Sequence, residues 1–262
     1  MTDDTSTQLV VVGAGPGGYA AAFLASDLGM KVTLIDPAPN PGGVCLYRGC
    51  IPSKALLHVA KLLAEAKEAE SWGITFGEPT IDIDRLRGFK QGVVDKLTSG
   101  LGQLTGRRGI EYVQGRASFV DGRNLTIDLT AGGERKLSFE HAIVATGSVP
   151  ISIPLFPSGS ARLLDSTSAL DLEEVPKRLL VVGGGYIGLE LGTVYAALGS
   201  EVTVVEMMPG LLPGADADLV RPLKKRLGEA FADILLSTKV VGYEETADAA
   251  KVSFEDKKGE KS

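Results

Sequence analysis

The 262-residue chain has only two cysteines, two histidines and one tryptophan, and it contains no long apolar run. Its first residues are polar and acidic and are followed by a short apolar stretch, which argues against a signal peptide or a membrane span. The formal net charge is −6 without a basic stripe, so we expect no nucleic-acid partner. A cytoplasmic protein without a membrane partner is the default expectation. The 44% hydrophobic content suffices for one large or two modest domains.

The two cysteines, Cys45 and Cys50, lie five positions apart in the segment Gly42–Lys54. In a reducing compartment, a close cysteine pair is more often catalytic or redox-sensing than structural. An amphipathic helical pattern begins just after Cys50, so we expect this residue near a helix N-terminus, where the helix dipole favours a thiolate. Two buried structural thiols are the alternative interpretation.

The spacing of the cysteines requires a distorted backbone if the two sulfurs are to meet. A regular helix would hold residues five apart at about 8 Å, which is too far for a disulfide. Pro52 has no N–H and would clash with the carbonyl of Arg48, so a helix running through this segment must be unwound. We expect this distortion to let Cys45 and Cys50 approach each other.

Residues 8–36 read as a buried strand, a glycine turn, an alanine-rich helix and a second strand that ends in an acid. Gly13, Gly15 and Gly18 fit the pattern G-x-G-x-x-G. In that pattern the first glycine allows the tight turn, the second lets a pyrophosphate approach, and the third lets the helix pack against the strand. Asp36 is placed to bind a ribose hydroxyl. This context predicts a dinucleotide site rather than a merely structural turn.

Residues 178–206 repeat the same pattern at a constant offset of 170. Glu206 takes the place of Asp36, and a second dinucleotide site is therefore predicted. Glu206 would repel a 2′-phosphate, and Met207 and Met208 offer no arginine to hold one, so we expect NAD rather than NADP. The second glycine turn comprises Gly183, Gly184, Gly185, Tyr186, Ile187 and Gly188.

The pattern between and after the two turns predicts helices over 54–71, 82–105 and 216–230, and strands within 110–146, 234–243 and 250–254. Turns are expected at Asp121-Gly122 and at Ala131-Gly132-Gly133, and a charged tail from Glu255. Prolines and Ser158-Gly159-Ser160 mark a linker, which predicts domains at 1–150 and 151–262. Only 56 residues follow Glu206, so the second domain is expected to be cut short.

With these motifs in view, the chain resembles the flavin-dependent pyridine nucleotide–disulfide oxidoreductases over its whole length. The segment Gly42–Lys54 is highly specific to that family. The resemblance implies an α/β fold with two Rossmann-like dinucleotide-binding domains, the first for FAD and the second for NAD, and no metal site. Family members are homodimers with a third, C-terminal dimerisation domain, which the resemblance implies is absent from this chain.

The resemblance also assigns site residues. It implies that FAD is held by Gly13, Gly15, Gly18, Asp36, Gly43, Lys54, Gly115, Ala117, Ala145, Thr146 and Gly147, although glycine is usual at position 117. It implies that NAD is held by Gly183, Gly184, Gly185, Tyr186, Ile187, Gly188, Glu206 and Val240.

The reaction that the resemblance implies is the oxidation of dihydrolipoamide to lipoamide, with electrons passing through a Cys45–Cys50 disulfide and FAD to NAD⁺. Cys45 would exchange with substrate and Cys50 would contact the flavin. The substrate would arrive on a lipoyl domain of a 2-oxo acid dehydrogenase complex. An ion pair between Lys54 and Glu190 is expected beside the flavin. Another disulfide or mercuric-type reductase, and an inactive dinucleotide-binding fragment, are the alternatives.

Several residues depart from the family pattern. Tyr47 and Arg48 stand between the cysteines where Asn-Val is more usual, which would alter access to the first cysteine. Tyr186 occupies a position where glutathione reductases have a tyrosine that shields the flavin. The family's catalytic histidine–carboxylate pair has no counterpart, because His58 and His141 are expected to be surface or packing residues. We therefore expect this chain alone to be poorly active.

Overall fold

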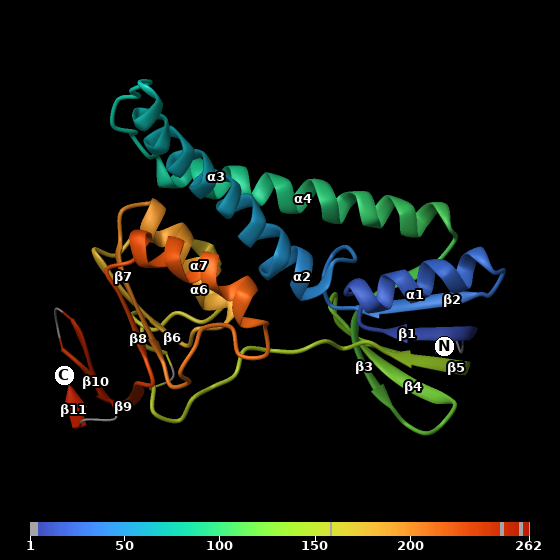
Figure 1. Ribbon diagram of the computed structural model, residues 1–262. Coiled ribbons are helices and arrows are strands. Elements are labelled where there is room, and N and C mark those ends of the chain that lie inside the picture. The colour runs from blue at the N-terminus through green and yellow to red at the C-terminus, as the bar shows by residue number, and fades with distance from the viewer. Residues whose placement is uncertain (1–4, 158, 247–248, 257–258, 262) are drawn as a thin grey trace. The chain divides into compact units, whose positions relative to one another are not determined.

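The computed structural model describes residues 5–157, 159–246, 249–256 and 259–261 (Figure 1). The chain forms two compact units. The first unit contains Met1–Pro52 and Lys90–Val149, and the second contains Ser53–Phe89 and Pro150–Ser262. The two units divide at Pro150, and residues 53–89 belong to the second unit. The helices α3 (Cys50–Glu68) and α4 (Ile83–Arg107) each run from one unit into the other.

The first unit is built on a closed five-stranded sheet. Its strands are β1 (Thr5–Val12), β2 (Val32–Asp36), β3 (Glu111–Phe119), β4 (Asn124–Leu129) and β5 (Glu134–Val144). β1 runs parallel to β2 and β5, and β2 runs parallel to β3, whereas β4 is antiparallel to β3 and β5. The predicted turn after β3 is confirmed, where the Asp121 carboxylate accepts the N–H of Arg123 at 2.7 Å.

Alternation along β1 divides the core of the first unit into two layers, because successive strand side chains point to opposite faces. Leu9 and Val11 pack with residues of α1 (Pro16–Asp27), such as Ala22. Val10 and Val12 point to the opposite face, into the interior of the closed sheet. Figure 1 shows α1 lying along the outside of β1 and β2. Each fully buried valine or leucine contributes about 1.5–3 kcal/mol to folding.

The second unit contains the second predicted half-site. β6 (Arg178–Val182), β7 (Glu201–Glu206) and β8 (Asp233–Leu236) form a parallel sheet in that order, with α6 (Tyr186–Ala197) and α7 (Ala217–Ala230) beside it (Figure 1). Tyr195 is fully buried and donates its hydroxyl to Ala169 O in α5 (Ser168–Asp171) at 2.9 Å. Leu56 of α3 and Leu86 of α4 join the same core, which explains why residues 53–89 belong to this unit.

The last strands form an antiparallel sheet of β9 (Lys239–Glu245), β10 (Ala250–Asp256) and β11 (Gly259–Lys261). Two predictions were wrong here. The single strand expected over 234–243 is divided into β8 and β9, because Ser237 takes a left-handed backbone conformation with φ of 52°. The charged tail expected from Glu255 is instead the end of β10, paired with β11. Parts of that tail, and the linker residue Ser158, lie outside the described residues.

The predicted helices are otherwise confirmed with small shifts at their ends. The helix expected over 54–71 corresponds to α3 and the short 3₁₀ segment η1 (Ala69–Trp72), and that over 82–105 corresponds to α4. The helix expected over 216–230 is α7. Within the part of the chain that the structure describes, we find no helix with both the length and the apolar content needed to cross a bilayer.

Candidate functional site

Both predicted glycine turns connect a strand to a helix as expected, the first joining β1 to α1 and the second joining β6 to α6. The third glycine of each turn packs on the first. A Cβ added to Gly188 would lie 2.8 Å from the carbonyl oxygen of Gly183, and one added to Gly18 would overlap the carbonyl oxygen of Gly13. A side chain at either position would push the helix off its strand, which matches the packing role predicted for the third glycine.

Asp36, at the end of β2, braces the first turn. Its Oδ2 accepts the N–H of Ala14 at 2.8 Å, and its Oδ1 accepts the N–H of Ala38 at 2.9 Å. The hydroxyl of Tyr112 donates to Ala38 O at 2.9 Å, and burial, followed by the nearby Asp36 carboxylate, raises the pKa of Tyr112. The carboxylate thus fixes the turn to the strand end, a role that sequence reasoning missed. Its contact with a ribose stays a prediction.

Glu206, at the end of β7, does the same for the second turn. Its Oε2 accepts the N–H of Gly184 at 2.6 Å, and its Oε1 accepts the N–H of Met208 at 2.7 Å. The side chain is buried, with only 6% of the residue exposed. Because these contacts repeat those of Asp36 at the same offset, the acid at the strand end is a shared structural element of both turns.

Gly43 and the segment Ala145–Gly147 meet the first turn at the carboxyl ends of the parallel strands. Gly43 has a φ of +58°, and a Cβ there would overlap the Cα of Gly15. The N–H of Ala145 donates to Val12 O at 2.8 Å and so continues the pairing of β5 with β1. Gly15 caps α1 without a side-chain hydrogen bond, so the first N–H groups of α1 are suited to a pyrophosphate. These residues form a cradle that fits a dinucleotide.

Gly115 and Ala117 lie in β3 beyond the carboxyl end of β2, since Asp36 is the register partner of Gln114. Gly115 packs closely against β4, because a Cβ there would lie 2.6 Å from Asp128 O. The structure therefore places both residues at the same edge of the sheet as the first glycine turn, and their contact with FAD stays a prediction.

The two cysteines occupy two helices separated by a break. Cys45 lies in α2 (Gly43–Arg48) and is half-buried, whereas Cys50 begins α3 and is exposed; both are thiols in this structure. The predicted interruption is confirmed, but it occurs at Gly49. A Cβ on Gly49 would lie only 2.9 Å from the carbonyl oxygen of Val44. Pro52 falls in the first turn of α3, where a missing N–H is tolerated.

Two tyrosines, Tyr19 and Tyr47, have surroundings that the sequence did not reveal. Burial, followed by the electrostatic effect of Cys45, raises the pKa of Tyr19 in α1. The hydroxyl of Tyr47 donates to Asn40 O at 3.0 Å and accepts the N–H of Asn40 at 3.2 Å. Tyr47 therefore fastens α2 to the loop after Asp36.

The predicted ion pair between Lys54 and Glu190 is confirmed within the second unit. Lys54 Nζ lies 2.6 Å from Oε1 and 2.7 Å from Oε2 of Glu190. The pair is open to solvent, because the side chains of Lys54 and Glu190 are 58% and 30% exposed. Solvent screening reduces such a pair to about 0–1 kcal/mol.

We therefore expect Glu190→Gln to lower the free energy of unfolding by less than about 1 kcal/mol, because water already solvates much of the Lys54 ammonium. Urea denaturation measures this change, and Glu65→Gln, which removes the exposed Lys61–Glu65 pair, is the matched control. A loss above about 3 kcal/mol in Glu190→Gln alone would mean that the pair is desolvated.

The residues singled out in the sequence also include Tyr186, Val240 and the two histidines. Tyr186 begins α6 and is 68% exposed, and Val240 lies in β9. His58 and His141 are both exposed, in agreement with the surface role expected of them.

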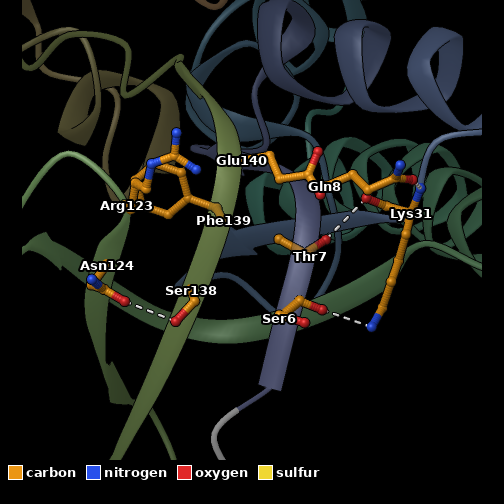
Figure 2. Close-up of a pocket in the computed structure, with 9 residues that line it drawn as sticks. All are labelled: Ser6, Thr7, Gln8, Lys31, Arg123, Asn124, Ser138, Phe139 and Glu140. Carbon is orange, nitrogen blue, oxygen red and sulfur yellow. Dashed lines mark hydrogen bonds between the residues drawn. The ribbon is translucent and has the colours of Figure 1, made fainter.

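Two of the depressions in the described surface bear on the predicted sites. One, of about 380 Å³, lies near the N-terminal end of β1, at the opposite end of the strand from the glycine turn, and is shown in Figure 2. Lys31 Nζ donates there to Ser6 O at 2.7 Å, so the strand ends are tied together. The other, of about 430 Å³, lies after the carboxyl end of β7 and is lined by Met207, Pro209, Ser237, Lys239, Glu255 and Asp256.

Comparison with known proteins agrees with this geometry. Residues 7–261 match the family model described as pyridine nucleotide-disulphide oxidoreductase. The chain is 48% identical over 257 residues to a dihydrolipoyl dehydrogenase of Haemophilus influenzae and 46% identical to one of Vibrio cholerae, with 98% of this chain and 54% of each relative covered. The chain therefore spans about half the length of these relatives.

Among solved structures, the chain is similar to the HOCl-induced flavoprotein disulfide reductase RclA from Escherichia coli. The TM-score is 0.79 at 26% identity, with 97% of this chain and 54% of that chain covered. The family match extends over both glycine turns and the cysteine segment. The chain belongs to the pyridine nucleotide–disulphide oxidoreductase family.

Proposed function

We propose that the first unit binds FAD, that the second binds NAD, and that Cys45 and Cys50 form a redox-active disulfide that accepts an electron pair from dihydrolipoamide. One observation carries the proposal. The helix that holds Cys45 begins at Gly43, and the backbone of Gly43 packs directly on Gly15 of the first glycine turn. The cysteines are therefore positioned by the same cradle that fits a dinucleotide. The 48% identity to a dihydrolipoyl dehydrogenase supports the choice of substrate.

The residues proposed to hold FAD surround the cradle. The N–H groups that begin α1 would bind the pyrophosphate, Asp36 the ribose, and Gly43 with Ala145–Gly147 would leave room for the ring system. When bound, the flavin would accept the electron pair of the dithiol and pass it to NAD⁺ as hydride. Lys54 lies one turn after Cys50 in α3 and would supply positive charge near the ring.

The exchange step would proceed by attack of a substrate thiolate on Sγ of Cys45 in the oxidised pair. The bond between the two protein sulfurs breaks, and its electron pair leaves on Sγ of Cys50. The second substrate thiolate then attacks the substrate sulfur of the mixed disulfide, which forms the product disulfide and releases Cys45 as a thiolate. The substrate gives up two protons and two electrons. The exposed position of Cys50 at the N-terminus of α3 leaves it accessible to a flavin.

The preference for NAD rests on Glu206. A 2′-phosphate beside this carboxylate would be repelled, and the next two residues, Met207 and Met208, offer no arginine to hold one. Glu206→Ala with Met207→Arg should shift the ratio of NADH to NADPH affinity toward NADPH. The double substitution should also cost about 1–3 kcal/mol of unfolding free energy, because the N–H groups of Gly184 and Met208 lose their acceptor.

Titration of both nucleotides and urea denaturation measure these two effects. Met207→Arg alone is the control, because it leaves the bracing carboxylate in place. Equal binding of NADH and NADPH by the unsubstituted chain would contradict the assignment of Glu206 to the ribose.

We further propose that the whole protein works as a cytoplasmic homodimer with a lipoyl domain as its substrate carrier, within a 2-oxo acid dehydrogenase complex. The relatives named dihydrolipoyl dehydrogenase support the lipoyl substrate in this assignment. In the family, a histidine–carboxylate pair takes the substrate proton. His58 lies about two helical turns after Cys50 and His141 lies in β5, so we assign neither histidine to that role. We therefore expect the 262-residue chain alone to turn over slowly, since a positioned base is worth about 10²–10⁴-fold.

The test of the cofactor assignment is gel filtration of the purified chain after incubation with FAD. The expected result is co-elution of one flavin per chain with a flavin absorption spectrum, together with saturable NADH binding. Elution of the folded chain without flavin would overturn the assignment of the first unit.

A further inference from the structure

The depression beside β7 lies where an open α/β sheet receives its ligand. Met207 and Pro209 follow the carboxyl end of β7, and Ser237 and Lys239 follow the carboxyl end of β8. Ligands of such sheets bind beyond the carboxyl ends of the strands. The main chain at this edge is fixed, because Thr238 donates its N–H to Glu206 O at 3.0 Å and Ser237 donates its N–H to Met208 O at 3.0 Å. The depression therefore adjoins the acid proposed to bind the ribose of NAD.

One wall of this depression is the β9–β10 hairpin, and its charges face each other across the two strands. Lys239 and Glu255 are register partners, and both line the depression. Side chains directly opposite in an antiparallel pair lie on the same face, and opposite charges there attract. Of the described residues that line this depression, Lys239 is the only cation, and Asp256 is a further acid.

We propose that Glu255 is a second specificity-determining residue for the pyridine nucleotide, acting through Lys239. This inference rests on the proposed binding of NAD by the second unit. Lys239 is the cation best placed in this wall to attract a 2′-phosphate, and Glu255 neutralises its charge. The hairpin and Glu206 thus select against NADP by the same means, which is the repulsion of negative charge.

The expected effect follows from the charge that is removed. A phosphate beside the ribose carries about two negative charges. Removing the carboxylate of Glu255 relieves its repulsion and leaves the ammonium of Lys239 to attract that phosphate. For charges several ångströms apart in largely aqueous surroundings, this corresponds to roughly five- to fifteenfold in affinity. NADH has no 2′-phosphate, so its affinity should change by less than about twofold.

The experiment is a titration of NADH and NADPH into the 262-residue chain and three variants, followed by intrinsic fluorescence or calorimetry. Glu255→Gln should bind NADPH about five- to fifteenfold more tightly than the unsubstituted chain, and Glu255→Gln/Lys239→Met should lose that gain. Glu244→Gln is the matched control, because Glu244 faces Lys251 across the same two strands but does not line the depression. It should leave both affinities unchanged.

The outcomes separate this inference from the proposed function. If NADH binds but Glu255→Gln leaves NADPH binding unchanged, or if Glu244→Gln gives the same gain, the role of Glu255 is wrong while the NAD site stands. A gain that persists without Lys239 would also overturn the inference. If the folded chain binds neither nucleotide, the NAD site itself is wrong and the inference falls with it. Circular dichroism of each variant checks that the chain keeps its overall secondary structure.

Discussion

Replacing Cys45 with serine should slow the reduction of the FAD-loaded chain by dihydrolipoamide by a factor of about 10³ or more. Thiol–disulfide exchange requires a sulfur that the incoming thiolate can attack, and a serine oxygen can form neither the protein disulfide nor the mixed disulfide. When catalytic residues act as a unit, replacing one of them typically removes most of the rate enhancement that the whole unit provides. Stopped-flow absorbance under anaerobic conditions measures the rate in a single turnover, which does not depend on repeated catalysis.

Val44→Ala is the matched control for this experiment, because Val44 precedes Cys45 in α2 and its side chain is 41% exposed. It should leave the rate within about twofold, since it removes little buried apolar surface. Reduction of the Cys45→Ser variant within tenfold of the unsubstituted chain would show that electrons reach the flavin without Cys45, and the proposed exchange step would be wrong.

Gly43→Ala should lower the free energy of unfolding by about 2–5 kcal/mol and abolish FAD retention. The left-handed backbone at this position, with φ of +58°, costs a residue with a Cβ about 1–2 kcal/mol. The added methyl group would also overlap the Cα of Gly15, and overpacking costs about 1–3 kcal/mol more. Because the contact joins two backbones, no side-chain rotation relieves it. Urea denaturation and gel filtration with FAD measure the two effects.

The variant Gly29→Ala separates the cost of the left-handed backbone from the cost of the steric overlap. Gly29 also has a left-handed backbone, with φ of +89°, but nothing lies within 4 Å of a Cβ built there. This control should lose only about 1–2 kcal/mol and keep FAD. Equal losses in both variants would mean that the packing of Gly43 on Gly15 contributes nothing, and that the cysteine helix is not positioned by the glycine turn.

The two strand–turn–helix–strand halves were predictable because each is encoded locally. Buried strands, glycines at fixed spacing and an acid at the strand end all lie within about 30 residues. The close packing of Gly18 and Gly188 follows from the same spacing. The bracing role of Asp36 and Glu206 was not predicted, because the motif names a ligand for these acids and says nothing of the backbone N–H groups beside them.

Features that depend on distant pairing were missed. The first sheet closes because β5 pairs with β1, although more than 120 residues separate the two strands in sequence. The amphipathic pattern of α3 predicts a helix with one apolar face, but it does not say which core receives Leu56. The sequence analysis assigned Glu255 to a charged tail, because the exposed end of a hairpin carries few apolar residues.

The central claim is that the Cys45–Cys50 pair exchanges electrons with a flavin held by the first glycine turn. The most direct measurement is the visible spectrum of the FAD-loaded chain after anaerobic addition of one equivalent of dithiol, for the unsubstituted chain and for Cys50→Ser. We expect a long-wavelength absorption band, typical of a thiolate against the flavin, in the unsubstituted chain and its absence in Cys50→Ser. An unsubstituted chain that retains FAD but shows no such band, or a Cys50→Ser variant that shows it, would contradict the account.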